Sequence, residues 1–82
     1  MIEELSPVVL LIDRPEHDLR AGDVGTVVDV HSKGLPGVGY SVEFLTMNGE
    51  TIAVLELEAD QIRPTRSTDI IHVRELASAD AG

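Results

Sequence analysis

Apolar residues in this chain occur in short runs separated by turn-forming residues, and this pattern restricts the fold more than any other feature. Each run has the length of a strand and is too short for a typical helix, which needs roughly 10–12 residues. Before residue 58 no stretch has the spacing of an amphipathic helix. The sequence therefore predicts an all-β protein. The expected strands cover residues 8–12, 24–30, 40–44, 51–57 and 62–63.

Turn signals stand between these runs. Asn48-Gly49 predicts a hairpin with a type I′ turn, which needs a positive φ at both central residues. The glycine-rich residues 31–39 predict a loop, and residues 58–61 predict a single helical or 3₁₀ turn. This spacing is typical of a small barrel or sandwich, and a barrel would also protect the sheet edges.

The segment Gly22-Asp23-Val24-Gly25 has two interpretations. Closely spaced glycines can bind phosphate, but the known phosphate motifs place them before a helix or next to Gly-Lys-Ser/Thr. Here the segment leads from a loop into a strand, contains no lysine and carries an aspartate. Glycine is also tolerated where a strand bends sharply. The segment is therefore interpreted as a turn, not as a ligand site.

Alternation within the strands predicts which side chains form the core. Tyr40 and Phe44 are the only aromatic residues, so the core must be mostly aliphatic. In the strand 24–30 the even-numbered residues are expected to face it. The residues expected to be buried are Val28, Val30, Tyr40, Val42, Phe44 and Ile62, with Val9 and Leu11 packed against them.

Length and charge restrict the kinds of partner. The chain has 82 residues, which suits one domain, and it has no cysteine and a net charge of −9. Nucleic acids and anionic membranes are bound mainly by Lys and Arg, so neither is an expected partner. A basic protein partner is favoured instead. The first residues lack the basic region of a signal peptide, and no stretch could span a bilayer, so a cytoplasmic protein is expected.

Three segments together carry a resemblance to a known family: VVLLIDRPEHDLRAGDVGTVVDV, YSVEFLTMNGETIAV and ADQIRP. With the ending DIIHVREL, they resemble a family of short uncharacterised bacterial proteins with an SH3-like barrel. The element GDVGTV alone is also similar to the barrel of the nitrile hydratase β subunit and to ribosomal KOW segments. The resemblance implies a small five-stranded SH3-like barrel with a C-terminal tail. It implies no activity, although such proteins are often companions of larger, toxin-like gene neighbours.

Catalytic and cofactor signals are weak. The three histidines lie far apart in the sequence, and none has the spacing of zinc ligands to another. His17 with Glu16 and Asp18 could form a surface metal site, but three solvated loop side chains explain the pattern better. No serine lies in a nucleophile elbow. We therefore expect no enzyme activity, no cofactor and no metal.

The C-terminal residues carry apolar side chains that the five strands do not require. The expected division is a barrel over residues 1–64 and a tail over 65–82, ordered at about 69–76. Ile70, Ile71, Val73 and Leu76 fit either a strand or a helix. They are expected to pack on their own barrel, on a second copy or on a partner, with Arg74 left toward solvent.

These observations favour an acidic protein-binding module without catalytic activity, whose partner is another protein or a second copy. Such a module could be the small companion of a neighbouring larger, toxin-like protein. The alternatives are an accessory or subunit of an enzyme such as nitrile hydratase, and a homo-oligomeric structural protein. The expected contact residues are Glu16, His17, Leu35, Ile70, His72, Val73 and Leu76.

Overall fold

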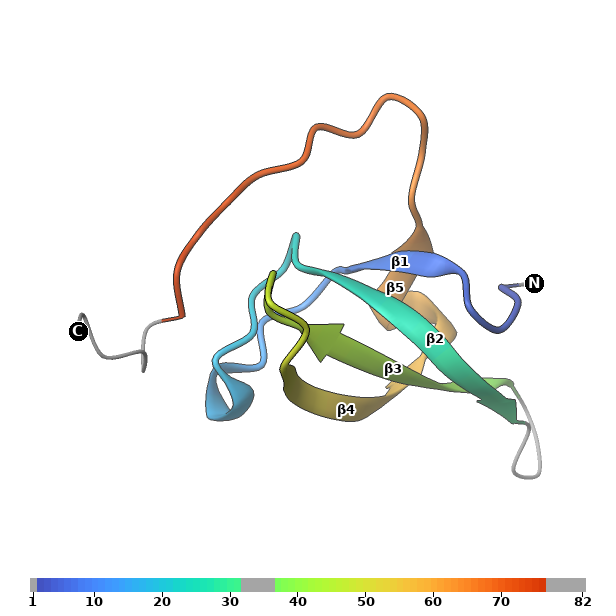
Figure 1. Cartoon of the computed structure of the whole chain (residues 1–82). Helices are drawn as coiled ribbons and strands as arrows, with labels where there is room; N and C mark the ends of the chain where they lie inside the picture. Colours follow the sequence, from blue (N-terminus) through green and yellow to red (C-terminus); the bar gives the residue numbers. More distant parts are fainter. Residues whose placement is uncertain (1, 32–36, 77–82) are drawn as a thin grey trace.

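The computed structural model describes residues 2–31 and 37–76, and in these ranges the protein is all-β (Figure 1). Two single-turn 3₁₀ helices, η1 (Pro15–His17) and η2 (Ala59–Gln61), are the only helical elements of the described residues. The turn expected at 58–61 is therefore present as η2. The strands are β1 (Pro7–Leu10), β2 (Val24–His31), β3 (Gly39–Leu45), β4 (Thr51–Glu58) and β5 (Ile62–Pro64).

The strands form one antiparallel sheet in the order β4-β3-β2-β1-β5. β1 lies between β2 and β5, so the first and last strands of the chain pair with each other in the sheet. β4 and β5 are the two edges, and within the described residues no ladder joins them. The all-β fold is confirmed, whereas closure of the sheet into a barrel stays a prediction.

The core is mostly aliphatic and receives side chains from all five strands. Tyr40, Val42, Phe44 and Ile62 are buried as predicted, and Val9 is also buried. The complete set of buried apolar residues is Val8, Val9, Leu10, Leu19, Val27, Tyr40, Val42, Phe44, Leu55, Leu57 and Ile62.

The prediction for β2 is wrong in its first half because of a β-bulge. Val27 pairs with Val42, but the next pair joins Asp29 to Ser41, so Val28 is an extra residue. Before the bulge the odd-numbered residues face the core, and Val27 is fully buried while Val28 is 37% exposed. After the bulge the phase changes, and Val30 packs half-buried against the core.

The prediction for Leu11 is also wrong. β1 ends at Leu10, and the fully buried side chains are those of Val8 and Leu10. Leu11 lies after the strand and is 43% exposed. The apolar run 8–12 is continuous, so its sequence contained no alternation that could identify the inward side chains.

The two glycines of the Gly-Asp-Val-Gly segment serve the backbone in different ways. Gly22 has φ of 101° in a turn closed by the bond from the Asp23 N–H to the Arg20 carbonyl. Gly25 lies in β2 with no room for a side chain, since an added Cβ would be 2.7 Å from Val42 Cγ1. The turn interpretation is therefore supported by the geometry of both residues.

The hairpin at Asn48-Gly49 is present, but its turn type differs from the prediction. Residues 46–50 connect β3 to β4, and the Gly49 N–H donates to the Thr46 carbonyl at 2.9 Å. Gly49 has a φ of 88°, whereas Asn48 is not among the residues with positive φ. A type I′ turn requires a positive φ at both Asn48 and Gly49, so this hairpin has a longer connection in place of a type I′ turn.

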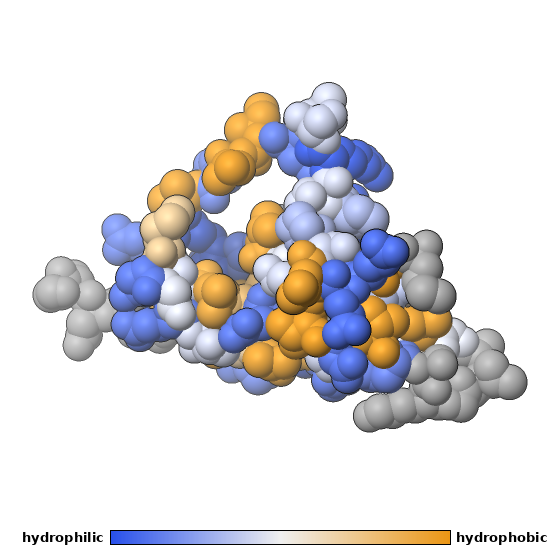
Figure 2. Space-filling view, turned by 45° about the vertical axis from the view of Figure 1, so that its right-hand side comes forward, coloured by the Kyte–Doolittle hydropathy of each residue, from blue (hydrophilic) through white to orange (hydrophobic). Residues whose placement is uncertain are grey.

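After β5 the chain leaves the sheet as an arch that is neither strand nor helix over residues 65–76 (Figure 1). The arch returns to the opposite end of the sheet, near the loop between β1 and β2. In the space-filling view, hydrophobic side chains lie along the arch and open space separates it from the sheet (Figure 2).

Candidate protein-binding surface

The loop between β1 and β2 is a compact, pre-ordered projection. Arg14 and Leu19 exchange backbone hydrogen bonds of 2.9 and 3.1 Å around η1. Asp18 closes this turn in the left-handed region, with φ of 58°. Leu19 is buried in the core and anchors the projection to the sheet. The exposed residues of η1, which include Glu16 and His17, are therefore held in a defined position.

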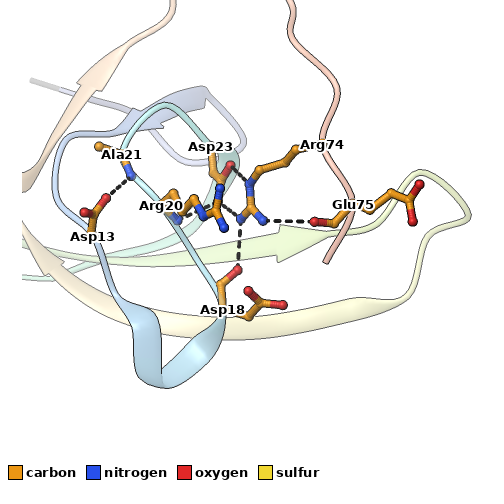
Figure 3. A network of polar contacts seen from close by, with 7 residues as sticks. All are labelled: Asp13, Asp18, Arg20, Ala21, Asp23, Arg74 and Glu75. Atoms are coloured by element: carbon orange, nitrogen blue, oxygen red, sulfur yellow. Dashed lines mark hydrogen bonds and ion pairs between the residues drawn. The ribbon is translucent and has the colours of Figure 1, made fainter. Parts of the chain in front are cut away.

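Two carboxylates hold the next part of the loop from either side. Asp13 Oδ1 accepts the Ala21 N–H at 2.9 Å, and Asp23 Oδ2 accepts the Arg20 N–H at 2.8 Å (Figure 3). These bonds satisfy backbone donors that the irregular chain would otherwise leave unpaired. Asp23 is consequently fixed with its carboxylate directed toward the returning tail.

Arg74 binds this carboxylate across 51 residues of sequence. Its Nε donates to Asp23 Oδ1 at 3.0 Å and its Nη2 to Asp23 Oδ2 at 2.5 Å. Nη2 also donates to the Asp18 carbonyl at 2.9 Å (Figure 3). The hydrogen-bonded Asp23 carboxylate raises the pKa of Arg74 above its ordinary value. The prediction that Arg74 points to solvent is therefore wrong, because a planar guanidinium fits a fixed carboxylate in two parallel bonds.

A second ion pair holds the other end of the arch. Arg63 of β5 donates to both oxygens of Asp69, at 3.0 and 2.9 Å. Asp69 Oδ2 also accepts the Arg66 N–H at 2.7 Å. The Arg63 hydrogen bonds, followed by the Arg66 N–H, lower the pKa of Asp69 to about 2. The segment from Asp69 to Arg74, called the strap from here on, is thus tied at both ends.

The middle of the strap is apolar and exposed. Ile70, Ile71 and Val73 are 90%, 91% and 79% exposed, and His72 is also exposed. Within the described residues none of these four forms a backbone hydrogen bond. The structure therefore does not pack the three apolar side chains on the chain's own sheet, although the ion pairs hold the strap in place.

Beyond the strap, Leu76 returns to the loop between β1 and β2. It is half-buried and lines a shallow groove together with Glu16 and His17. The other walls of this groove come from the β3–β4 hairpin, including Glu50 and Ile52. Leu76 is therefore a neighbour, in the structure, of Glu16 and His17, two expected contact residues that lie far from it in the sequence.

The remaining expected contact residues are placed differently. Ile70, His72 and Val73 lie on the strap, away from the groove that Leu76 lines. Leu35 lies outside the described residues, so its predicted role is not addressed by this structure.

A polar cluster crosses β2, β3 and β4 at the far end of the sheet. His31 Nε2 is 2.7 Å from Glu56 Oε1 and 3.3 Å from Ser41 Oγ, and Ser41 Oγ donates to Glu56 Oε2 at 2.5 Å. The ring fits because Gly39 has no side chain, since a Cβ there would be 2.9 Å from His31 Cε1. Sequence reasoning did not connect these residues, because the strand register brings them together.

This cluster contains serine, histidine and glutamate but lacks the geometry of a nucleophilic triad. In such a triad, the histidine contacts the nucleophile through one ring nitrogen and the acid through the other. Here Nε2 faces both groups, Ser41 donates its proton to Glu56, and His31 Nδ1 is buried with no partner among the described residues. Across residues 2–31 and 37–76, no group of three or more histidine or acidic side chains is arranged to hold a metal ion.

Most of the positive charge near the arch is already engaged by carboxylates of the chain. Arg14 pairs with Glu16 at 2.6 Å, Arg63 pairs with Asp69, and Arg74 pairs with Asp23. The surface therefore presents mainly acidic groups, in agreement with the net charge of −9.

Comparison with protein families identifies the family to which the strand region belongs. The family model described as Domain of unknown function (DUF4926) matches residues 4–64. The chain therefore belongs to the DUF4926 family, which confirms the expected membership in an uncharacterised family. The match ends at the last residue of β5, before the strap.

No curated protein and no solved structure gave a match to this chain. The predicted similarity to the barrel of the nitrile hydratase β subunit consequently stays a prediction. Among residues 2–31 and 37–76, no helix has the length and apolar character required to cross a membrane.

Proposed function

We propose that this chain is an acidic protein-binding module with an SH3-like barrel and no catalytic activity. The observation that carries the proposal is the strap, in which three exposed apolar side chains are held at defined positions by two ion pairs. An exposed apolar group that is also ordered is a feature of interaction surfaces.

The strap carries apolar surface that a partner could cover. Covering one Ile or Val side chain is worth about 1.5–3 kcal/mol. Ile70, Ile71 and Val73 gain almost none of this in the isolated chain because they are nearly fully exposed. A partner that covers all three would recover it, less the cost of association.

The negative charge of the chain restricts the kinds of partner that it can bind. A net charge of −9 repels nucleic acids and anionic membranes, and it also opposes association with a second copy. A basic protein is therefore the partner that the surface favours, and a larger, toxin-like neighbour is one protein that could supply it. The groove formed by Glu16, His17 and Leu76 would extend the contact beyond the strap.

The test uses the intact chain, tagged and expressed in its native host, followed by identification of the proteins that co-purify. The identified partner is then produced separately and titrated calorimetrically against the wild type and against I70S/I71S/V73S. The control is Val54→Ser, at an exposed apolar residue of β4 that belongs neither to the strap nor to the groove lining. We expect the strap variant to bind at least tenfold more weakly and the control to bind like the wild type. Equal affinity of all three proteins would refute the proposal.

The same experiment separates the alternatives. A partner that is an enzyme, and whose activity changes on binding, would favour an accessory subunit. A wild type that sediments as a dimer, while the strap variant is a monomer, would favour a homo-oligomeric structural protein.

A further inference from the structure

We infer that the strap binds by strand addition: residues 70–73 pair backbone to backbone with an exposed edge strand of a basic protein. This inference rests on the proposed function, since it specifies how the proposed module contacts its partner.

The strap presents unused hydrogen-bonding groups. None of residues 70–73 donates or accepts a backbone hydrogen bond within the described part of the chain. The neighbouring residue Asp69 does donate, to the Arg66 carbonyl, so the unpaired region begins where the strap leaves its first anchor. Such a row of free N–H and C=O groups is what a strand adds to a sheet edge.

The strap cannot satisfy these groups on its own sheet in the described conformation. The arch stands clear of the sheet, with open space between them (Figures 1 and 2). The anchors lie at the two ends, with Arg63–Asp69 beside β5 and Arg74–Asp23 at the loop before β2. The free segment is therefore stretched between two fixed points, which lowers the entropy lost when a partner orders it.

The side chains of the strap suit a strand better than a helix. Three of the four residues, Ile70, Ile71 and Val73, are β-branched, and β-branched residues favour extended backbone. In an extended conformation Ile71 and Val73 share one face, and Ile70 and His72 share the other. A partner edge strand could then cover apolar side chains on both faces of the added strand.

The charges around the strap favour a basic partner strand. The two arginines that anchor the strap, Arg63 and Arg74, are neutralised by carboxylates of this chain, whereas Glu75, directly after the strap, forms no ion pair among the described residues. With the net charge of −9, the approach of an edge strand rich in lysine or arginine is favoured electrostatically. Basic residues are common on exposed edge strands, where they discourage aggregation.

The experiment uses the intact ¹⁵N-labelled protein and three synthetic peptides of defined sequence. The first alternates lysine and valine, and the second alternates glutamate and valine. The third repeats the lysine–valine sequence with N-methyl groups on alternate peptide bonds, which block backbone pairing along one edge. Binding is measured from amide chemical shifts, and hydrogen exchange is measured residue by residue over 69–76. We expect the first peptide to bind and to slow exchange of alternate amides between Ile70 and Val73.

Matched substitutions in the strap separate backbone pairing from side-chain docking. Successive N–H groups of a strand point to opposite edges, so a partner on one edge uses either the Ile71 or the His72 N–H. Proline removes the donor, and alanine at the same position keeps it. We expect Ile71→Pro or His72→Pro, but not both, to bind roughly tenfold more weakly than its alanine counterpart. The Arg74 side-chain signals report whether each variant keeps its anchor.

Each contrary result has a separate meaning. Proline variants that bind like their alanine counterparts would overturn strand addition but leave the proposed function intact, because the apolar side chains could still dock. Equal binding of the glutamate–valine peptide would overturn the basic partner. Absence of binding by every peptide would overturn the inference, whereas the proposed function is decided by the native partner. A dimer with protected strap amides would identify the occupant as a second copy and overturn it as well.

Discussion

Gly25→Ala should destabilise the protein through a steric clash and not through backbone strain. The new Cβ would be 2.7 Å from Val42 Cγ1, 2.9 Å from the Glu43 carbonyl oxygen and 2.9 Å from Phe44 Cε1. The Val42 and Phe44 side chains belong to the core, and the Glu43 oxygen is part of the β3 backbone, so none can easily move away. Overpacking of a well-packed core costs about 1–3 kcal/mol.

The free energy of unfolding is measured by urea titration, with circular dichroism as the signal. A loss of about 2 kcal/mol would lower the melting temperature of a domain of this size by roughly 8–16 °C. Such a loss is large beside a total stability of roughly 4–12 kcal/mol. Thr26→Ala is the control, because Thr26 is the next residue in β2 and is half-buried. A Gly25→Ala protein as stable as the wild type would show that β2 does not approach β3 so closely.

Three further outcomes test the core, the anchor and the ion pair of the strap. Phe44→Ala should lower the free energy of unfolding by about 3–5 kcal/mol, and an unchanged urea midpoint would contradict the described core, in which Phe44 is buried. Asp23→Asn removes the charge that holds Arg74, so the Arg74 Nε–H signal should shift and exchange faster with solvent, with little change in global stability; an unchanged Nε–H signal would contradict the described anchor. The pKa of Asp69 is lowered from 3.8 to about 2, so the contribution of its contact with Arg63 is complete above about pH 4 and is lost as the pH falls through 2. A carboxyl titration by NMR with a midpoint near 3.8 would refute this last prediction.

Local sequence was sufficient wherever one segment decided its own structure. The alternation of Tyr40, Val42 and Phe44 identified β3 and its buried face, because successive side chains of a strand point to opposite sides. The hairpin at Asn48-Gly49 and the 3₁₀ turn at 59–61 were also recognised from adjacent residues. Each of these signals depends on sterics or hydrogen bonds within a few residues of chain.

The errors occurred where a neighbouring strand decided the outcome. The bulge at Val28 exists because β3 pairs with Val27 and then with Asp29, and nothing in residues 24–30 alone indicates the skipped residue. The cluster of His31, Ser41 and Glu56 likewise depends on the registers of two ladders. The hairpin turn was assigned the wrong type because the register of β4 against β3 lengthened the connection.

Some features of the candidate surface follow from the sequence, and others follow only from the tertiary structure. Sequence alone determined that the chain is acidic, that its core is aliphatic, and that residues 70–76 carry apolar side chains that the strands do not need. Only the tertiary structure decided that Arg74 meets Asp23, and that the strap is held away from the sheet with its backbone unpaired. An ion pair between residues 51 positions apart leaves no local pattern, because its geometry is set by the fold that brings the loop and the tail together.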